Sequence, residues 1–277
     1  MTNIITYITH SLHDLYPLRE LQSLTAIICK DLLGLDETAI YLRKDIKLSG
    51  NGQRLLEQAV DRLKRREPIQ YICGTAYFYG LAFHVEPGVL IPRPETEEMV
   101  DLILKENSGG IRVLDIGTGS GCIAVSLAAH LPAGRVDAWD ISGKALSVAS
   151  RNAGEQGVDV HFSQVDVFGA EPGEDKYDVI VSNPPYVGEK EKETMDRNVL
   201  DWEPGLALFV PDDDPLRFYR HIARLGTGML LPGGKLYFEI NRAYGPETVE
   251  LLNVLNYKNI RLIKDLVGND RIITAIK

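Results

Sequence analysis

The first part of the chain carries hydrophobic residues at helical spacing. Leucine, isoleucine, alanine and valine recur every three or four positions in two stretches of the first 70 residues. These positions are Leu21, Leu24, Ile27 and Ile28, and then Leu55, Leu56, Ala59, Val60 and Leu63. Gly34 and the Ser-Gly-Asn-Gly stretch at 49–52 interrupt the pattern, and Pro68 ends it. The spacing therefore predicts a small helical domain over residues 1–75.

The pattern changes between residues 71 and 91. Aromatic and aliphatic residues replace the helical spacing, with Gly74, Gly80 and Gly88 between them. The β-prone positions are Tyr71, Ile72, Tyr77, Phe78, Tyr79, Leu81, Phe83 and Val85. This composition predicts a β-hairpin that bridges two domains, and we place this linker at residues 76–91.

From residue 111 onward, strand-like apolar runs alternate with helical patterns. Strands are expected at 112–116, 135–139, 160–164, 177–182, 234–240, 260–265 and 271–276. Helices are expected at 99–105, 121–130, 142–156, 216–225 and 246–255, the third of them capped by Ser142. Such alternation is typical of a mostly parallel, doubly wound sheet, which binds ligands beyond the carboxyl ends of its strands. The pattern therefore predicts an α/β domain over residues 92–277.

Composition narrows the class of protein. The 277 residues are 44% hydrophobic and 25% charged, the balance of an ordinary globular protein. No apolar run approaches the ~18–20 residues of a membrane helix, and residues 1–10 lack the pattern of a secretory signal. Cys29, Cys73 and Cys122 form no metal-binding or disulfide spacing. We therefore expect a cytoplasmic protein without a metal site and without a membrane anchor.

Charge separates the two parts of the chain. Residues 1–75 carry a net charge of about +1, whereas residues 76–277 carry about −10, within an overall charge of −9. An acidic chain is not expected to bind long nucleic acid stably, because phosphate neutralisation dominates that affinity. The basic run at 62–66 has two interpretations: it complements a helix dipole, or it forms a patch for a partner.

A glycine-rich turn follows the first strand of the α/β domain. Residues 113–121 read Val-Leu-Asp-Ile-Gly-Thr-Gly-Ser-Gly, without the G-x-G-x-x-G phase of a dinucleotide site. Asp115 precedes the turn, where a carboxylate repels phosphate and attracts an ammonium group. S-adenosylmethionine carries an amino group and a sulfonium but no phosphate. The expected cofactor contacts in the turn are Gly117, Thr118, Gly119, Ser120 and Gly121.

Two further strand ends complete the predicted cofactor site. Asp140 ends the second strand, where a carboxylate can accept both ribose hydroxyls, and Ile141 can pack on the adenine. After the third strand, Asp166 can accept the adenine amine and Phe168 can form an apolar wall. Together with the glycine turn, this ordered set predicts S-adenosylmethionine.

The fourth strand runs into Asn183, Pro184, Pro185 and Tyr186. The Asn183 side-chain oxygen and the Pro184 carbonyl can accept the two N–H groups of a planar amine and favour the charge that develops on its nitrogen. The prolines fix the backbone, and Tyr186 offers a ring face. These residues therefore indicate methyl transfer to a planar amino group. Two substrate classes remain open: exocyclic amines of nucleic-acid bases and side-chain amides of glutamine.

Further motifs resemble one family. They are Glu-Pro-Ile-Gln-Tyr-Ile at 67–72, Leu-Ile-Pro-Arg-Pro-Glu-Thr-Glu at 90–97, Asn-Pro-Pro-Tyr at 183–186, Trp-Glu-Pro at 202–204 and Gly-Asn-Asp-Arg at 268–271. With these, nearly the whole chain resembles the protein-(glutamine-N5) methyltransferases of the HemK/PrmC type, which modify peptide-chain release factors.

The resemblance implies a class I (Rossmann-like) methyltransferase fold, with a seven-stranded mostly parallel sheet and a small N-terminal helical domain for the substrate. It implies methyl transfer from S-adenosylmethionine to the glutamine of a Gly-Gly-Gln motif, with S-adenosylhomocysteine as product. It also implies that Arg93, Pro94 and Thr96 line the cofactor pocket and that Asn183 contacts the cofactor as well as the glutamine. A monomer that binds release factors is expected.

The chain departs from the family's sequence pattern at two positions, and alternative interpretations stay open for one stretch of the chain and for the function. Phe168 stands where the family often has tryptophan, and Asn241 stands where it often has glycine. The charged stretch 189–196 is either a solvated loop or a lid over the substrate. The alternative functions are an amino-methyltransferase of a nucleic-acid base and a non-enzymatic module that binds S-adenosylmethionine.

Overall fold

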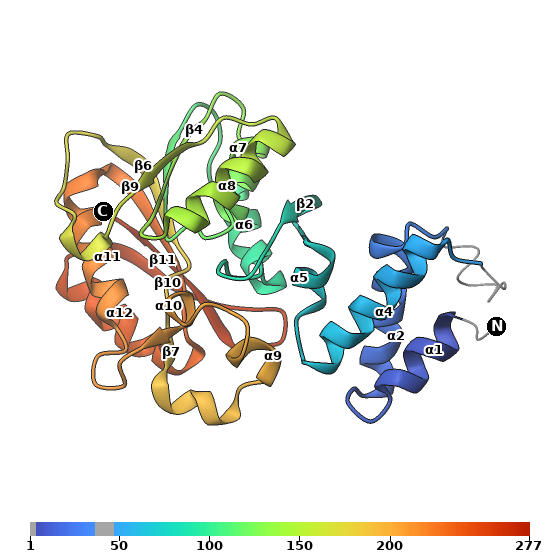
Figure 1. Ribbon diagram of the computed structural model, residues 1–277. Helices are drawn as coiled ribbons and strands as arrows, with labels where there is room; N and C mark the ends of the chain where they lie inside the picture. Colours follow the sequence, from blue (N-terminus) through green and yellow to red (C-terminus); the bar gives the residue numbers. More distant parts are fainter. Residues whose placement is uncertain (1–3, 37–46) are drawn as a thin grey trace. The chain divides into compact units, whose positions relative to one another are not determined.

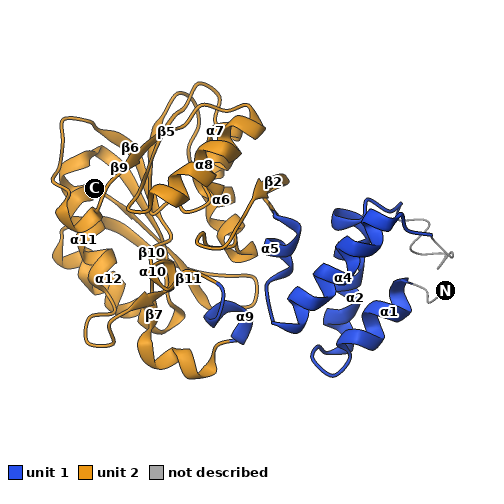
Figure 2. Ribbon diagram, viewed as in Figure 1, with its two compact units in different colours: residues 1–75, 196–202 blue, residues 76–195, 203–277 orange. Residues whose placement is uncertain are grey.

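The computed structural model describes residues 4–36 and 47–277, which divide into two compact units (Figures 1 and 2). Unit 1 comprises residues 1–75 and 196–202, and unit 2 comprises residues 76–195 and 203–277. The chain therefore passes between the units three times. Residues 1–3 and 37–46 of the predicted helical domain lie outside the described residues.

The described part of unit 1 is built mainly from helices. They are α1 (Ile4–Leu12), α2 (Leu18–Ile27), the π-helical turn η1 (Ile28–Leu32), α4 (Gly50–Lys64), α5 (Ile69–Cys73) and α9 (Arg197–Leu200). The predicted helical spacing is confirmed, because Leu21, Leu24, Leu56 and Leu63 all belong to one buried core. The Ser49 hydroxyl caps α4 by accepting the Gly52 N–H at 3.1 Å.

Two residues of the basic run have structural partners within unit 1. The Arg62 guanidinium donates to both carboxylate oxygens of Glu67, at 2.7 and 2.5 Å. The Arg66 guanidinium lies over the Tyr16 ring at 4.6 Å from its centroid. Arg62 and Arg66 therefore make contacts within unit 1, in addition to any interaction with the helix dipole.

The predicted hairpin is present but shorter than its β-prone sequence suggests. Strands β1 (Thr75–Phe78) and β2 (Leu81–His84) pair through a turn in which Tyr79 and Gly80 have φ of 47° and 74°. Positive φ at both central residues is the geometry of a type I′ hairpin turn. The expectation of strand structure at Tyr71 and Ile72 is wrong, since both lie in α5, which follows Pro68.

Unit 2 contains a seven-stranded sheet with the order β10-β11-β9-β6-β3-β4-β5. The strands are β3 (Arg112–Ile116), β4 (Arg135–Asp140), β5 (His161–Gln164), β6 (Tyr177–Ser182), β9 (Leu230–Glu239), β10 (Lys258–Lys264) and β11 (Asp270–Ile276). All neighbours are parallel except at β11, which is antiparallel to both β9 and β10. This arrangement confirms the predicted mostly parallel α/β fold.

Helices cover both faces of this sheet. One face packs against α6 (Pro94–Glu106), α7 (Cys122–His130) and α8 (Gly143–Gln156). The other packs against α11 (Arg217–Met229) and α12 (Gly245–Val254). Alternation along β3 sends Val113 into the first core and Leu114 into the second. The carboxyl ends of the parallel strands β3, β4 and β6 lie at the same edge of the sheet, and residues at these ends line a cavity.

Short elements complete unit 2. They are η2 (Val167–Gly169), β7 (Val187–Gly188), η3 (Glu189–Thr194), α10 (Gly205–Leu208), β8 (Phe209–Val210) and η4 (Arg242–Tyr244). Residues Glu189–Thr194 of the charged stretch 189–196 form the 3₁₀ helix η3, and its two interpretations, a solvated segment or a lid, stay open. Among the described residues, no helix is both long and apolar enough to span a bilayer.

The junction of α11 and β9 differs from the prediction. The helix continues to Met229, four residues beyond the predicted end, and the strand begins at Leu230, four residues before its predicted start at Gly234. Gly233 has a φ of 78°, and the register between β6 and β9 shifts at this point. A bulge at the glycines therefore lets the strand extend backwards through a sequence that is typical of a turn.

Candidate active site

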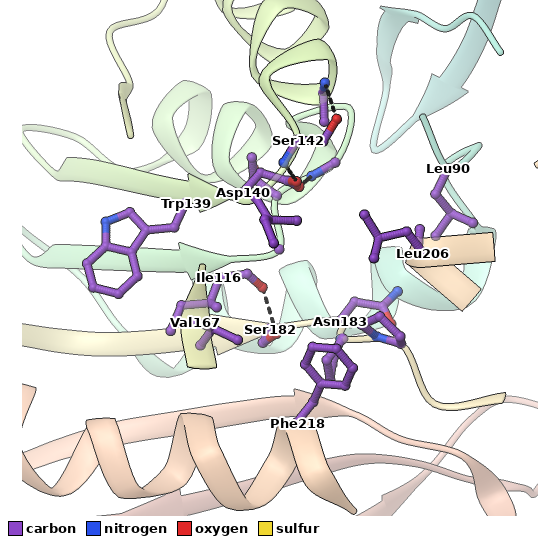
Figure 3. Close-up of a pocket in the computed structure, with 18 of the residues that line it drawn as sticks. Leu90, Ile116, Trp139, Asp140, Ser142, Val167, Ser182, Asn183, Leu206 and Phe218 are labelled. Atoms are coloured by element: carbon purple, nitrogen blue, oxygen red, sulfur yellow. Dashed lines mark hydrogen bonds between the residues drawn. The ribbon is translucent and has the colours of Figure 1, made fainter. Parts of the chain in front are cut away.

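A cavity of about 370 Å³ opens at the carboxyl edge of the sheet in unit 2 (Figure 3). That volume lies within the usual range for small-molecule sites. Of the predicted site residues, Gly117, Thr118, Gly119, Ser120, Asp140, Ile141, Asp166, Phe168, Arg93, Thr96, Asn183, Pro184 and Pro185 line it. Gly121, Pro94 and Tyr186 do not. The fold therefore brings most of the predicted set to one cavity.

The glycine turn forms one wall with its backbone. The N–H groups of Gly117 and Thr118 donate to the Trp139 carbonyl at 2.8 and 3.0 Å, which ties the turn to the end of β4. Gly117 and Gly119 have φ of 77° and 58°, and no protein atom lies within 4 Å of the place where a Cβ would stand. A ligand can therefore approach this backbone closely, because no side chain fills the space.

Gly121 has a different role from the one predicted. It caps α7 with a φ of 81°, and a Cβ at this position would stand 3.0 Å from the Ala149 Cβ on α8. The expectation that Gly121 contacts the cofactor is therefore not supported. The glycine instead allows close packing of α7 against α8.

Asp115 lies beneath the turn and not in the cavity. Its carboxylate is fully buried and accepts the Thr118 hydroxyl at 2.6 Å. Burial raises the pKa of Asp115 to about 7, although hydrogen bonds from Thr118 and from the Ala124 N–H in the first turn of α7 act in the opposite direction. Asp115 Oδ2 therefore holds the Thr118 side chain of the turn, and the expectation that this carboxylate attracts the ammonium group of the cofactor stays a prediction.

Asp140 is held by two backbone groups at the end of β4. Its Oδ2 accepts the Gly119 N–H at 2.9 Å, and its Oδ1 accepts the Ser142 N–H at 2.8 Å (Figure 3). Burial raises its pKa, against the effect of these N–H donors. Each oxygen retains a further lone pair, so the carboxylate can receive two hydroxyl groups in a fixed orientation.

Apolar side chains flank Asp140. Ile141 is 46% exposed and Phe168 is 36% exposed, and both line the cavity. The Phe168 ring packs on Phe218 at 4.8 Å between centroids, and the Arg217 guanidinium lies over it at 4.5 Å. Asp166 caps the turn that carries Phe168 by accepting its N–H at 2.9 Å. These walls suit a planar heterocycle beside the carboxylate.

The Asn-Pro-Pro-Tyr segment leaves β6 at the same edge. Asn183 Nδ2 donates to the Thr96 hydroxyl at 3.3 Å, and Asn183 lies with Leu206 and Leu90 on the side of the cavity opposite Trp139 (Figure 3). The Tyr186 hydroxyl donates to Glu239 Oε1 at 3.1 Å, and burial raises the pKa of Tyr186. The prolines line the cavity, whereas the Tyr186 ring lies behind it.

The segment before α6 is fixed by a buried acid that the site prediction missed. Arg93 donates to Glu203 Oε1 at 2.5 Å, and the Ile91 N–H donates to Oε2 of the same carboxylate at 3.1 Å. Pro94 occupies the first turn of α6 and supplies its start, not a cavity wall. The Trp-Glu-Pro motif at 202–204 was the available signal, but its partner lies 110 residues away.

Glu239 is the second missed residue. It ends β9 with no exposed surface and accepts the Thr96 hydroxyl at 2.6 Å as well as the Tyr186 hydroxyl. Burial raises its pKa, and the nearby Arg271 charge opposes this effect. An acid at the end of a central strand could have indicated this position, because the neighbouring strand ends carry the other site residues.

The residues present fit S-adenosylmethionine. The glycine backbone leaves room for the ligand, the fixed Asp140 carboxylate suits a ribose, and the apolar walls suit adenine. The two arginines that line the cavity are already engaged, Arg93 with Glu203 and Arg217 with Phe168. Within the described part of the chain, no group of three or more His, Cys, Asp or Glu side chains could hold a metal ion.

Comparisons with known proteins agree with this geometry. The methyltransferase small domain matches residues 96–200, and the PrmC N-terminal domain matches residues 4–74. A methyltransferase structure from Pyrococcus furiosus aligns with a TM-score of 0.54 at 20% identity, over 83% of this chain and 99% of that one, which supports the fold.

Sequence relatives are closer. A release factor glutamine methyltransferase of Bacteroides thetaiotaomicron is 57% identical over 276 residues, 99% of each chain. The protein of the same name in Flavobacterium psychrophilum is 46% identical over 276 residues, 98% of this chain and 97% of that one. At this identity and coverage, the chain belongs to the release factor glutamine methyltransferase family.

Proposed function

We propose that this protein transfers the methyl group of S-adenosylmethionine to the side-chain amide nitrogen of the glutamine in the Gly-Gly-Gln motif of peptide-chain release factors. The observation that carries the proposal is the convergence of Asn183, Pro184 and Pro185 with Asp140 and the glycine turn on one cavity. Family membership favours a glutamine amide over a nucleic-acid base as the acceptor.

The cofactor side of the cavity orients the donor. S-adenosylmethionine, when bound, supplies a methyl group on a positively charged sulfur. Asp140 holds the ribose, Ile141 and Phe168 enclose the adenine, and the backbone at Gly117 and Gly119 contacts the amino acid portion. Asp166, whose Oδ1 already accepts the Phe168 N–H, also accepts the adenine amine, and Asn152 Nδ2 holds the Ser120 carbonyl of the glycine turn.

The substrate side presents two acceptors to a planar amide. Asn183 uses its Nδ2 for Thr96, so its Oδ1 is the end that accepts one N–H of the glutamine. The Pro184 carbonyl accepts the other N–H, and the proline rings prevent both acceptors from moving away. Two acceptors stabilise the positive charge that develops on nitrogen, and the holding of donor and acceptor in line supplies much of the rate. The product nitrogen can lose its proton after transfer, so no side chain needs to act as a strong base.

The helical part of the chain binds the body of the release factor. Residues 1–75 are nearly neutral, whereas residues 76–277 are strongly acidic, so the two parts suit different surfaces of a partner. The match of residues 4–74 to the PrmC N-terminal domain supports this division of labour. The enzyme acts as a monomer in the cytoplasm, where release factors work.

A methyl-transfer assay tests the proposal. Purified protein with tritiated S-adenosylmethionine is offered a release factor, its Gln→Ala variant in the Gly-Gly-Gln motif, and bulk RNA and DNA in parallel. We expect label on the wild-type factor alone and a gain of ~14 Da on the Gly-Gly-Gln peptide in mass spectrometry. Label on nucleic acid alone would instead establish the alternative function, an amino-methyltransferase of a nucleic-acid base. Label on the Gln→Ala variant would show that a different residue of the release factor is methylated.

A further inference from the structure

A chain of hydrogen bonds leads from the cavity into the protein interior. Asn183 Nδ2 donates to Thr96 Oγ1 at 3.3 Å, and Thr96 Oγ1 donates to Glu239 Oε2 at 2.6 Å. Thr96 is 2% exposed and Glu239 is not exposed at all. Glu239 itself does not line the cavity. The carboxylate therefore reaches the cavity only through the residues that it holds.

The direction of these hydrogen bonds follows from the chemistry of the groups. An ionised carboxylate only accepts, and a threonine hydroxyl has one hydrogen to donate. Thr96 spends that hydrogen on Glu239 and has only lone pairs left for Asn183. The Asn183 amide must therefore turn its NH₂ end to Thr96. The flipped amide would place two acceptor oxygens against each other and leave buried groups unpaired.

The same carboxylate also holds the other end of the Asn-Pro-Pro-Tyr segment. The Tyr186 hydroxyl donates to Glu239 Oε1 at 3.1 Å, and Asn241 Nδ2 donates to the Tyr186 carbonyl at 3.1 Å. Pro184 and Pro185 therefore lie between two residues that are held by hydrogen bonds, Asn183 on one side and Tyr186 on the other. Glu239 is thus connected to both flanks of the segment that presents the acceptors.

We propose that Glu239 is a positioning residue which, through Thr96, fixes the Asn183 amide with its oxygen turned to the substrate and, through Tyr186, anchors the far end of the same segment. The role in turnover rests on the proposed function, whereas the orientation of the amide does not. Glu239, at the end of β9, would thus affect the reaction although it does not line the cavity.

Kinetics of Glu239→Gln provide the first test. Glutamine offers one acceptor where the carboxylate offers two, so one of the two hydroxyl groups loses its partner. We expect kcat for release-factor methylation to fall at least tenfold, while the Kd for S-adenosylhomocysteine, measured by calorimetry, stays within threefold. Glu106→Gln is the matched control, because Glu106 accepts the Tyr237 hydroxyl at 2.7 Å away from the cavity and should leave kcat unchanged. A loss of cofactor affinity as large as the loss of kcat would overturn the proposal.

A double-mutant cycle separates positioning from general stability. Thr96→Val removes the hydroxyl link and should lower kcat at least tenfold, whereas Thr96→Ser keeps the hydroxyl and should restore kcat to within threefold. In the Asn183→Ala background, Thr96→Val should cost less than twofold further, because the amide that Thr96 orients is gone, whereas Glu239→Gln can still lose the anchor at Tyr186. A multiplicative loss from Thr96→Val in that background would reject the proposal.

Spectroscopy of the amide tests the orientation without turnover. In protein labelled with ¹⁵N-asparagine, Asn183→Ala identifies the side-chain NH₂ signals of Asn183. We expect these signals to shift in Thr96→Val and Glu239→Gln and to stay in place in Glu106→Gln. Unchanged signals in the first two variants would refute the proposed orientation. If the wild-type enzyme failed to methylate release factors, the proposed function would fall, and these signals would still decide the role of Glu239.

Discussion

At the scale of single residues, backbone N–H groups donate hydrogen bonds to both carboxylate oxygens of Asp140 and so fix its orientation. In Asp140→Asn, the amide NH₂ must face the N–H of either Gly119 or Ser142, both of which donate to Asp140. We expect S-adenosylhomocysteine to bind about 10–100-fold more weakly, since the NH₂ cannot accept a ribose hydroxyl and a hydrogen bond to a charged group is worth about 1.5–3 kcal/mol. Calorimetry measures the change, with the exposed Asp159→Asn as control. Unchanged affinity would remove Asp140 from the site.

Asn183→Ala should separate catalysis from cofactor binding. The substitution removes an acceptor that matters most in the transition state, so we expect kcat to fall by about 100-fold or more. Affinity for S-adenosylhomocysteine should change much less. Steady-state kinetics and calorimetry on the same preparation measure both, with the exposed Asn253→Ala on α12 as control. A kcat within threefold of wild type would contradict the role given to Asn183.

Asp115 should make stability depend on pH. Its pKa is about 7 in the folded chain and about 3.9 in an unfolded one, so folding takes up a proton between these values. The folded state therefore loses stability as the pH rises from 4 to 7, by at most about 1.4 kcal/mol per pH unit, and then levels off.

Asp115→Asn has no such loss. In urea unfolding at pH 5, 6 and 8, its stability relative to wild type should therefore increase with pH. Asp159→Asn should run parallel to wild type. A constant difference between Asp115→Asn and wild type at all three pH values would exclude the expected titration.

Several functional positions follow from sequence, whereas others depend on partners far along the chain. Asp140 and Asn183 could be placed because parallel strands end at one edge. Glu203 and Glu239 were missed, although a motif and a strand end marked their positions, because their partners Arg93 and Thr96 lie 110 and 143 positions away. Local sequence patterns do not reveal side-chain pairs that are so far apart in the chain. The sequence also did not indicate that Asp115 and Gly121 lie outside the cavity lining, because spacing places a residue beside a turn without saying which way it faces.

At the scale of elements, close packing of α7 on α8 depends on Gly121. An alanine at this position would keep a φ of 81° and place its Cβ within 3.2 Å of the Ala149 backbone. We expect Gly121→Ala to lower the free energy of unfolding by about 3 kcal/mol, combining left-handed strain with overpacking. Gly157→Ala, with a φ of 66° and open space around it, should cost only about 1 kcal/mol. Equal losses in urea unfolding would show that the contact with α8 is unimportant.

The interiors of the strands were easier to predict than their ends. Tyr177–Ser182 and Arg112–Ile116 match the prediction, because each is an apolar run that the sheet buries on both faces. The start of β9 was missed because a bulge absorbs the glycines at 233 and 234. Tyr71 and Ile72 have β propensity but lie in α5, where Pro68 precedes the first helical residue and Ile72 packs into the core of unit 1.

At the scale of the whole molecule, charge should decide which polymers the protein avoids. Residues 76–277 carry a net charge of about −10, and the catalytic cavity lies within them. We expect a 30-base-pair duplex DNA to bind more weakly than ~10⁻⁴ M at 0.15 M salt, the weak limit of non-specific binders. Fluorescence anisotropy measures this, and the release factor labelled in the same way serves as the positive control. Micromolar binding to the duplex would contradict the expectation.

The segment 196–202 has a consequence for any attempt to isolate the helical unit. Trp202 donates its indole N–H to the Arg65 carbonyl at 3.2 Å, yet it is separated from Arg65 by most of the sheet in sequence. A gene fragment that stops after Thr75 would therefore express the unit without its last piece, and the remaining fragment would keep a tryptophan that belongs elsewhere. A faithful excision would need a fused copy of 196–202 at the end of the short fragment. Grafting this region onto another enzyme would thus require two insertions in the recipient, not one.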